Sequence, residues 1–164
     1  MTAPVVTGTA LVVGLGDPAR GDDGVGVAVA GLLATRSLPG VSVRVHRDPT
    51  ALIDLWAGHD PVVVVDAVRS GAAPGTVHRL VLGTGARPLP ASSWVASGRG
   101  THAFGLAAVV ELARALQRLP ERLVIVGVEA ASFGHGQPLS EPVLDALPGV
   151  VDRVVEEVTS RVSG

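Results

Sequence analysis

The stretch LVVGLGDPARGDDGVGVAVAGLLA, residues 11–34, joins an apolar strand to a helix through a glycine-rich turn. Residues 11–13 are apolar without alternation, which is typical of a strand buried on both faces of a parallel sheet. Gly14 and Gly16 interrupt this run and are expected to support the turn. The stretch therefore predicts the first strand–turn–helix unit of an α/β protein.

Two adjacent acids, Asp22 and Asp23, stand at the end of this turn. Asp22 directly precedes the periodic apolar segment, so we expect its carboxylate to cap the following helix by accepting a bond from a first-turn N–H. Asp23 is then left to point elsewhere.

The composition indicates a single domain spanning residues 1–164. The hydrophobic fraction is 47%, yet the chain has only two Phe, two Trp and no Tyr, so Val, Leu and Ala must build the core. The net charge is -2 and the basic residues are scattered arginines, which argues against a nucleic-acid partner and against an anionic membrane surface. The absence of cysteine excludes disulfides and thiolate chemistry.

The N-terminus is apolar but has neither the positive region nor the cleavage site of a signal peptide, and its apolar run is too short to span a bilayer. We therefore expect a cytoplasmic protein that does not enter a membrane, and we expect a monomer.

The rest of the chain alternates between strand and helix patterns. The predicted elements are a strand over 41–46, a short helix over 51–56 begun by Asp48 and Pro49, a buried strand over 62–65, a strand over 76–82, a helix over 101–119, a strand over 123–128 and a helix over 140–163 that Pro148 bends or interrupts. No helix separates the strand ending at 65 from the strand over 76–82, so the latter is expected to be antiparallel. The pattern predicts a three-layer α/β/α sandwich with a mostly parallel five-stranded sheet.

Three polar residues follow strands or open a helix where the loops of such a sheet converge: Asp23, Asp66 and His102. Two carboxylates and an imidazole suit a divalent transition metal such as nickel, zinc or iron. Each residue also has an ordinary structural interpretation, since Asp often begins turns and an isolated His says little. Glu129, at the end of the last strand, is expected to give structural support near this site.

A dinucleotide site is an alternative, because residues 14–19 fit the Gly-x-Gly-x-x-Gly/Ala fingerprint and Asp48 follows the second strand. Asp17, Asp22 and Asp23 would, however, repel a pyrophosphate placed at this turn. Peptidyl-tRNA hydrolase has a similar opening turn, but its catalytic histidine motif is missing here.

Four segments in order resemble the NiFe-hydrogenase maturation endopeptidases. They are GLGDPARGDDGVG (14–26), VVVVDAV (62–68), THAFGL (101–106) and GVEAASFGHGQPLSEPV (127–143), and the resemblance extends over residues 11–158. It implies an α/β sandwich of the phosphorylase/hydrolase-like kind. It also implies an enzyme that removes a C-terminal extension from the hydrogenase large-subunit precursor after nickel insertion.

The resemblance further implies that Asp23, Asp66 and His102 are metal ligands, and that the nickel is carried by the precursor. Asp17 stands where the family commonly has asparagine, and the segment around Glu129 lacks a proline that often follows the glutamate. The resemblance leaves open whether the enzyme itself holds a metal ion before it binds the precursor.

The expected chemistry is that of a nickel-dependent endopeptidase of the aspartyl or metallo type, with Asp23 and Asp66 as the catalytic candidates. The sequence leaves open whether the metal is catalytic or only a recognition signal, and whether Asp22 or Asp66 positions the attacking water. The alternatives are a non-catalytic dinucleotide- or nickel-binding assembly module and, less favoured, a peptidyl-tRNA hydrolase-like esterase.

Overall fold

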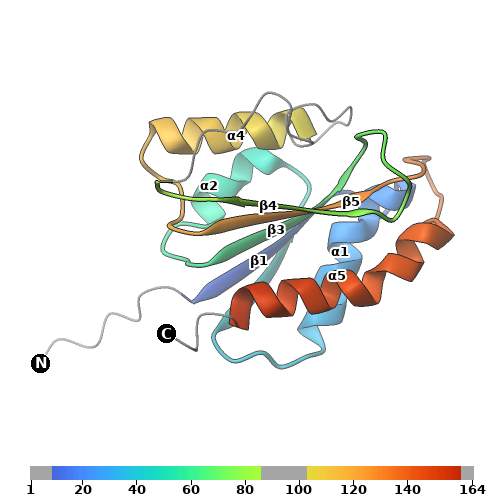
Figure 1. Cartoon of the computed structure of the whole chain (residues 1–164), viewed down its shortest axis with the longest axis horizontal. Coiled ribbons are helices and arrows are strands. Elements are labelled where there is room, and N and C mark those ends of the chain that lie inside the picture. The colour runs from blue at the N-terminus through green and yellow to red at the C-terminus, as the bar shows by residue number, and fades with distance from the viewer. Residues whose placement is uncertain (1–8, 86–102, 160–164) are drawn as a thin grey trace, which may run out of the picture.

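The computed structural model describes residues 9–85 and 103–159 (Figure 1). Its elements, in chain order, are β1 (Ala10–Leu15), the 3-10 helix η1 (Gly21–Gly24), α1 (Val25–Ala34), β2 (Val41–His46), the 3-10 helix η2 (Pro49–Ala51), α2 (Leu52–Leu55), β3 (Val62–Val68), β4 (Val77–Leu82), α4 (Ala103–Ala115), β5 (Leu123–Glu129) and α5 (Glu141–Thr159).

The five strands form one sheet in the order β2-β1-β3-β5-β4. Strands β2, β1, β3 and β5 run parallel, whereas β4 is antiparallel to β5. The chain between β3 and β4 is too short for a helical crossover, so β4 returns in the opposite direction at the far side of β5. This arrangement confirms the predicted mostly parallel sheet with one antiparallel strand.

Helices cover both faces of the sheet, with α1 and α5 on one side and α2 and α4 on the other (Figure 1). Side chains of β3 alternate between the two cores: Val63 and Val65 pack with the α1 and α5 layer, and Val62 and Val64 pack with the α2 and α4 layer. Every residue of β3 is buried, as the run of four valines predicts. The three-layer α/β/α architecture is therefore confirmed.

Helix α4 ends earlier than predicted, and Pro148 does not interrupt α5. Helix α4 ends at Ala115 rather than near Leu119, because Gln117 adopts a left-handed φ of 57° and the N–H of Arg118 returns to the carbonyl oxygen of Ala113 at 2.8 Å. Helix α5 continues through Pro148 without interruption. Pro148 lies on the exposed side of α5, so water can satisfy the carbonyl that the proline leaves without a helical partner.

None of the described helices is both long and apolar enough to cross a membrane.

Candidate active site

Asp23 lies at the carboxyl edge of the sheet, in the turn that connects β1 to α1. Its side chain is buried at 3% exposure, and its Oδ2 accepts a hydrogen bond from the main-chain N–H of Asp17 at 2.9 Å. The 3-10 helix η1 contains Asp23. It contacts β3, the strand that lies next to β1 in the sheet. The turn therefore holds one oxygen of this carboxylate in a fixed position.

Glycines allow this turn to fold tightly over the sheet. Gly16 has a φ of +131°, and a Cβ at this position would lie 1.9 Å from the carbonyl oxygen of Asp23. A Cβ on Gly14 would lie 2.1 Å from the carbonyl oxygen of Gly26 in α1. Both glycines predicted to support the turn are thus placed where a side chain would collide with main chain.

The expected role of Asp22 as the cap of α1 is wrong. Gly24 occupies the N-cap position of α1, and Arg20 that of η1, with no side-chain capping bond in either case. The Asp22 carboxylate instead accepts bonds from the main-chain N–H groups of Ala131 (2.8 Å), Ser132 (3.2 Å) and Ser140 (2.7 Å), and from the Ser140 hydroxyl (2.8 Å). It joins the first turn to the loop between β5 and α5.

Asp66 is fully buried within β3. By the alternation of β3, its side chain faces the α2 and α4 layer, beyond Val64. Its Oδ1 accepts the N–H of Ala67 at 2.8 Å, which fixes its orientation. Because β1 and β3 are parallel neighbours, with Gly14 opposite Val65, Asp66 and the turn carrying Asp23 occupy the same edge of the sheet.

His102 lies outside the described residues, so its position relative to the two carboxylates stays a prediction. The described first turns of α4 begin at Ala103, and a Cβ on Gly105 would lie 3.1 Å from the ring of Pro49. Pro49 follows the carboxyl end of β2, so this end of α4 is at the same edge as Asp66. Within residues 9–85 and 103–159, no three His, Asp or Glu side chains are grouped to hold a metal ion.

Glu129 ends β5 with its side chain 1% exposed. Its Oε1 accepts the N–H groups of Ser70 at 2.6 Å and Ala72 at 3.0 Å, and the Ser70 hydroxyl at 3.0 Å. His78 lies 3.4 Å from the other carboxylate oxygen. Glu129 thus anchors the loop that leads from β3 to β4.

The turn is not arranged as a phosphate cradle. The Asp17 N–H, which a bound anion would need, is already donated to the Asp23 carboxylate. Asp48 accepts the N–H of Thr50 at 2.9 Å and begins η2, as the Asp48-Pro49 pair predicts. These contacts give the dinucleotide alternative no support.

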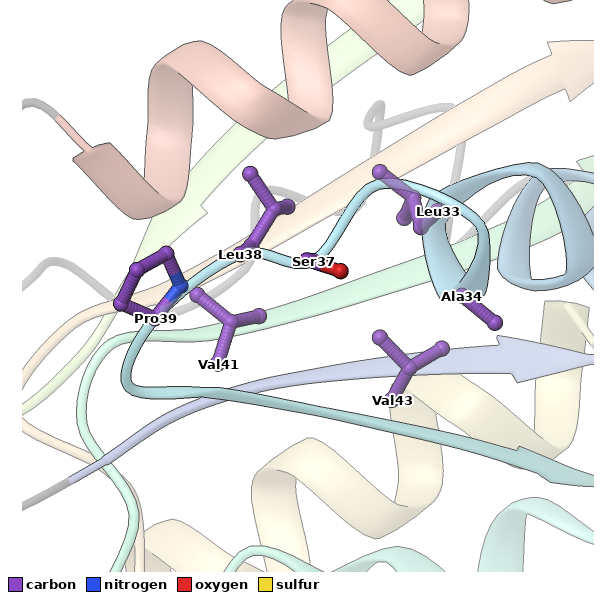
Figure 2. Close-up of a pocket in the computed structure, with 7 residues that line it drawn as sticks. All are labelled: Leu33, Ala34, Ser37, Leu38, Pro39, Val41 and Val43. Atoms are coloured by element: carbon purple, nitrogen blue, oxygen red, sulfur yellow. The ribbon is translucent and has the colours of Figure 1, made fainter.

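Cavities lined by described residues lie at both ends of β2. One, of about 480 Å³, lies at the carboxyl end of β2 beside the first turn, and it is lined by Gly16, Pro18, Val27, Val45, His46 and Arg47. No sequence pattern predicts this cavity, because it forms only when α1 and β2 are placed on either side of the turn. The other, of about 500 Å³, lies at the amino end of β2 and is lined by Leu33, Ala34, Ser37, Leu38, Pro39, Val41 and Val43 (Figure 2). Its described lining residues include no titratable side chain, and it lies at the opposite end of β2 from the carboxyl edge.

Solved structures share this architecture. The chain is similar to the hydrogenase maturating endopeptidase HybD from E. coli, with a TM-score of 0.77, 23% identity and 93% of each chain covered. It is similar to the NiFe hydrogenase maturation protease HybD from Thermococcus kodakarensis, with a TM-score of 0.70, 22% identity and coverage of 90% of this chain and 97% of that one. A hydrogenase 2 maturation peptidase from a Thaumarchaeota archaeon matches with a TM-score of 0.66, 27% identity and coverage of 92% and 97%.

No curated protein matches the chain. The model of the hydrogenase maturation protease family matches residues 47–157, which include Asp66, Glu129 and His102. Asp22 and Asp23 precede the matched region, and they are placed by the turn described above. Since the match covers more than half of the sequence, the chain belongs to the hydrogenase maturation protease family, a family of peptidases.

Proposed function

We propose that this protein is a processing endopeptidase that removes the C-terminal extension of a NiFe-hydrogenase large-subunit precursor after nickel has been inserted. Membership of the maturation protease family supports a precursor as the substrate. The observation that carries the assignment of the site is the placement of two buried carboxylates, Asp23 and Asp66, at one edge of the sheet.

The nickel in this reaction belongs to the precursor and is part of the substrate. Carboxylate oxygens and an imidazole nitrogen form a donor set that suits nickel, so we assign Asp23, Asp66 and His102 as the residues that recognise the loaded metal centre. Main-chain N–H groups hold one oxygen of Asp23 and one of Asp66 at 2.9 Å and 2.8 Å. Such prior orientation lowers the cost of engaging the substrate.

Peptide hydrolysis at this edge needs a group that takes a proton from water as its oxygen attacks the scissile carbonyl, and then delivers that proton to the departing amine. We assign this role to the Asp23 and Asp66 pair. No cysteine exists in the chain to act as an alternative nucleophile.

The test is the intact mass of nickel-loaded and nickel-free precursor after incubation with the protein. We expect shortening of the loaded precursor alone. Asp23→Asn, Asp66→Asn and His102→Ala should each slow cleavage by roughly a hundredfold or more, the scale of losing an acid–base group. Asp145→Asn, an exposed position on α5, serves as the matched control.

Two outcomes contradict the proposal. An unshortened loaded precursor overturns the activity, whereas normal cleavage by the three variants overturns the site.

We further propose that the enzyme acts as a monomer in the cytoplasm. Sedimentation of the purified protein tests the oligomeric state, and cell fractionation tests the location.

A further inference from the structure

β2 offers a free strand edge beside the candidate site. Among the described residues, β2 pairs with β1 alone. The carbonyl oxygen of His46 accepts the N–H of Gly16 at 3.1 Å, so the main-chain groups of His46 face β1. Main-chain groups alternate in direction along a strand, so those of Val43 and Val45 face away from the sheet. An extended peptide can pair with such an edge.

The cavity of about 480 Å³ lies at the carboxyl end of this edge and has apolar walls. Val45 from β2, Val27 from α1 and Pro18 from the first turn line it. Val45 is 53% exposed, although it is a large apolar residue on a strand. These walls suit an apolar side chain rather than a charged group.

The polar residues at this cavity are hydrogen-bond donors. The main-chain N–H of Asp48 donates to Nδ1 of His46 at 3.0 Å, so the neutral His46 ring carries its proton on Nε2. The Arg47 guanidinium is exposed and lies 3.8 Å from the Asp17 carboxylate. An extended peptide presents carbonyl oxygens, which can accept hydrogen bonds from these two side chains.

The cavity borders the turn that carries Asp23. Gly16 lines the cavity, and the space where its Cβ would be is filled by the main chain of Asp23. A peptide segment seated in the cavity therefore lies next to the turn that positions Asp23.

We propose that the carboxyl end of β2 and this cavity bind the precursor segment that flanks the scissile bond. The segment lies extended along the edge of Val43 and Val45, and one of its apolar side chains fills the space between Val27, Val45 and Pro18. This inference rests on the proposed function and specifies where the substrate of that reaction docks.

The enzyme side of the test compares Val45→Asp and Arg47→Ala with Val81→Asp. Val81 is an exposed valine on the opposite edge strand, β4, away from the cavity. We expect Val45→Asp to raise the KM for nickel-loaded precursor roughly tenfold with kcat nearly unchanged, because it removes binding shared by ground and transition states. Arg47→Ala should raise KM by a smaller factor, and Val81→Asp should leave both constants unchanged.

A second set of experiments changes the precursor and uses wild-type enzyme, so a folding defect of an enzyme variant cannot explain the rise in KM. Apolar residues flanking the scissile bond of the precursor are changed to Asp one at a time, and one position should show the same rise in KM. At that position, the Val45→Asp enzyme should add little further loss, because both changes remove one contact.

Binding of loaded precursor to Asp66→Asn enzyme, with and without Val45→Asp, separates this inference from the proposed function. If wild-type enzyme binds the precursor without shortening it, the proposed function fails, and the docking site is still judged by the change in Kd. Equal KM for wild type and Val45→Asp, together with equal Kd for Asp66→Asn enzyme with and without Val45→Asp, overturns the docking site, whatever the cleavage result.

Discussion

Asp22 and Asp23 are adjacent residues whose carboxylates serve different parts of the molecule. Asp23 accepts a bond from within its own turn, whereas Asp22 accepts bonds from residues more than a hundred positions away. The Asp22 contacts also fix Ser140, the residue that precedes α5. One carboxylate thus shapes the candidate site, and the other connects the turn beneath it to the last loop and helix.

We predict that Asp22→Ala destabilises the fold by about 3 to 5 kcal/mol. The change leaves three main-chain N–H groups without their charged acceptor in a site that is 1% exposed. Urea unfolding measures the effect. Asp145→Ala, an exposed acid on α5, should change stability by less than about 0.5 kcal/mol. Equal urea midpoints for Asp22→Ala and wild type would contradict the assigned role.

Local sequence rules could place Asp23 and Asp66 but not the partners of Asp22. Asp23 follows β1 and Asp66 lies near the carboxyl end of β3, and the carboxyl ends of parallel strands share one edge of the sheet, so strand order suffices. A capping role for Asp22 was the best local expectation, because Asp is a favoured N-cap. Its actual partners come from a loop whose path depends on the packing of α5, which no local pattern encodes.

The position of α1 depends on a close approach of its main chain to the main chain of the sheet. A Cβ on Gly26 would lie 2.5 Å from the carbonyl oxygens of both Leu15 and Val65. The first turn of α1 therefore rests directly on the ends of β1 and β3, with no side chain between them. This contact sets the height of the turn that carries Asp23 above the sheet.

Two glycines of α1 give opposite predictions for the same substitution. Gly26→Ala should destabilise the protein by about 3 kcal/mol or more, because helix and sheet must separate. Gly31→Ala should stabilise it by about 0.5 to 1 kcal/mol, because its Cβ meets nothing within 4 Å and Ala is the better helix former. Thermal unfolding of the two variants checks both. A stable Gly26→Ala protein would mean that α1 does not rest on main chain.

Element types and the antiparallel strand were predictable, whereas helix ends were not. The four consecutive valines predict that β3 is a buried strand, and the short connection from β3 to β4 predicts that β4 is antiparallel. The end of α4 depends on Gln117 adopting a left-handed conformation, for which Gly is the usual residue. The continuation of α5 through Pro148 depends on which side of the helix faces solvent, and this follows only from the packed structure.

Glu157 connects the layer of α1 and α5 to the antiparallel edge of the sheet. This residue of α5 is 4% exposed and accepts hydrogen bonds from Arg79 of β4 and, at 3.0 Å, from Arg122 just before β5. Burial raises the pKa of Glu157, but the hydrogen bonds and charges of the two arginines outweigh it, so the pKa lies below its ordinary value of 4.5. The hydrogen bond to Glu157 also raises the pKa of Arg79 above its ordinary range.

The lowered pKa of Glu157 makes part of the stability acid-sensitive. A carboxyl group with a depressed folded-state pKa stabilises the protein fully above its unfolded-state pKa, and this contribution is lost as pH falls through the folded-state value. We therefore predict that Glu157→Gln lowers stability at about pH 7 and that its difference from wild type shrinks below about pH 4. Urea unfolding across this pH range measures the difference.

Glu156→Gln is the control: the Glu156 side chain is 70% exposed, so the stability of this variant should match that of wild type at every pH. A difference that stays constant with pH would show that the charge of Glu157 does not hold β4 to α5, since only an ionised partner of the two arginines gives a stability that falls with acid.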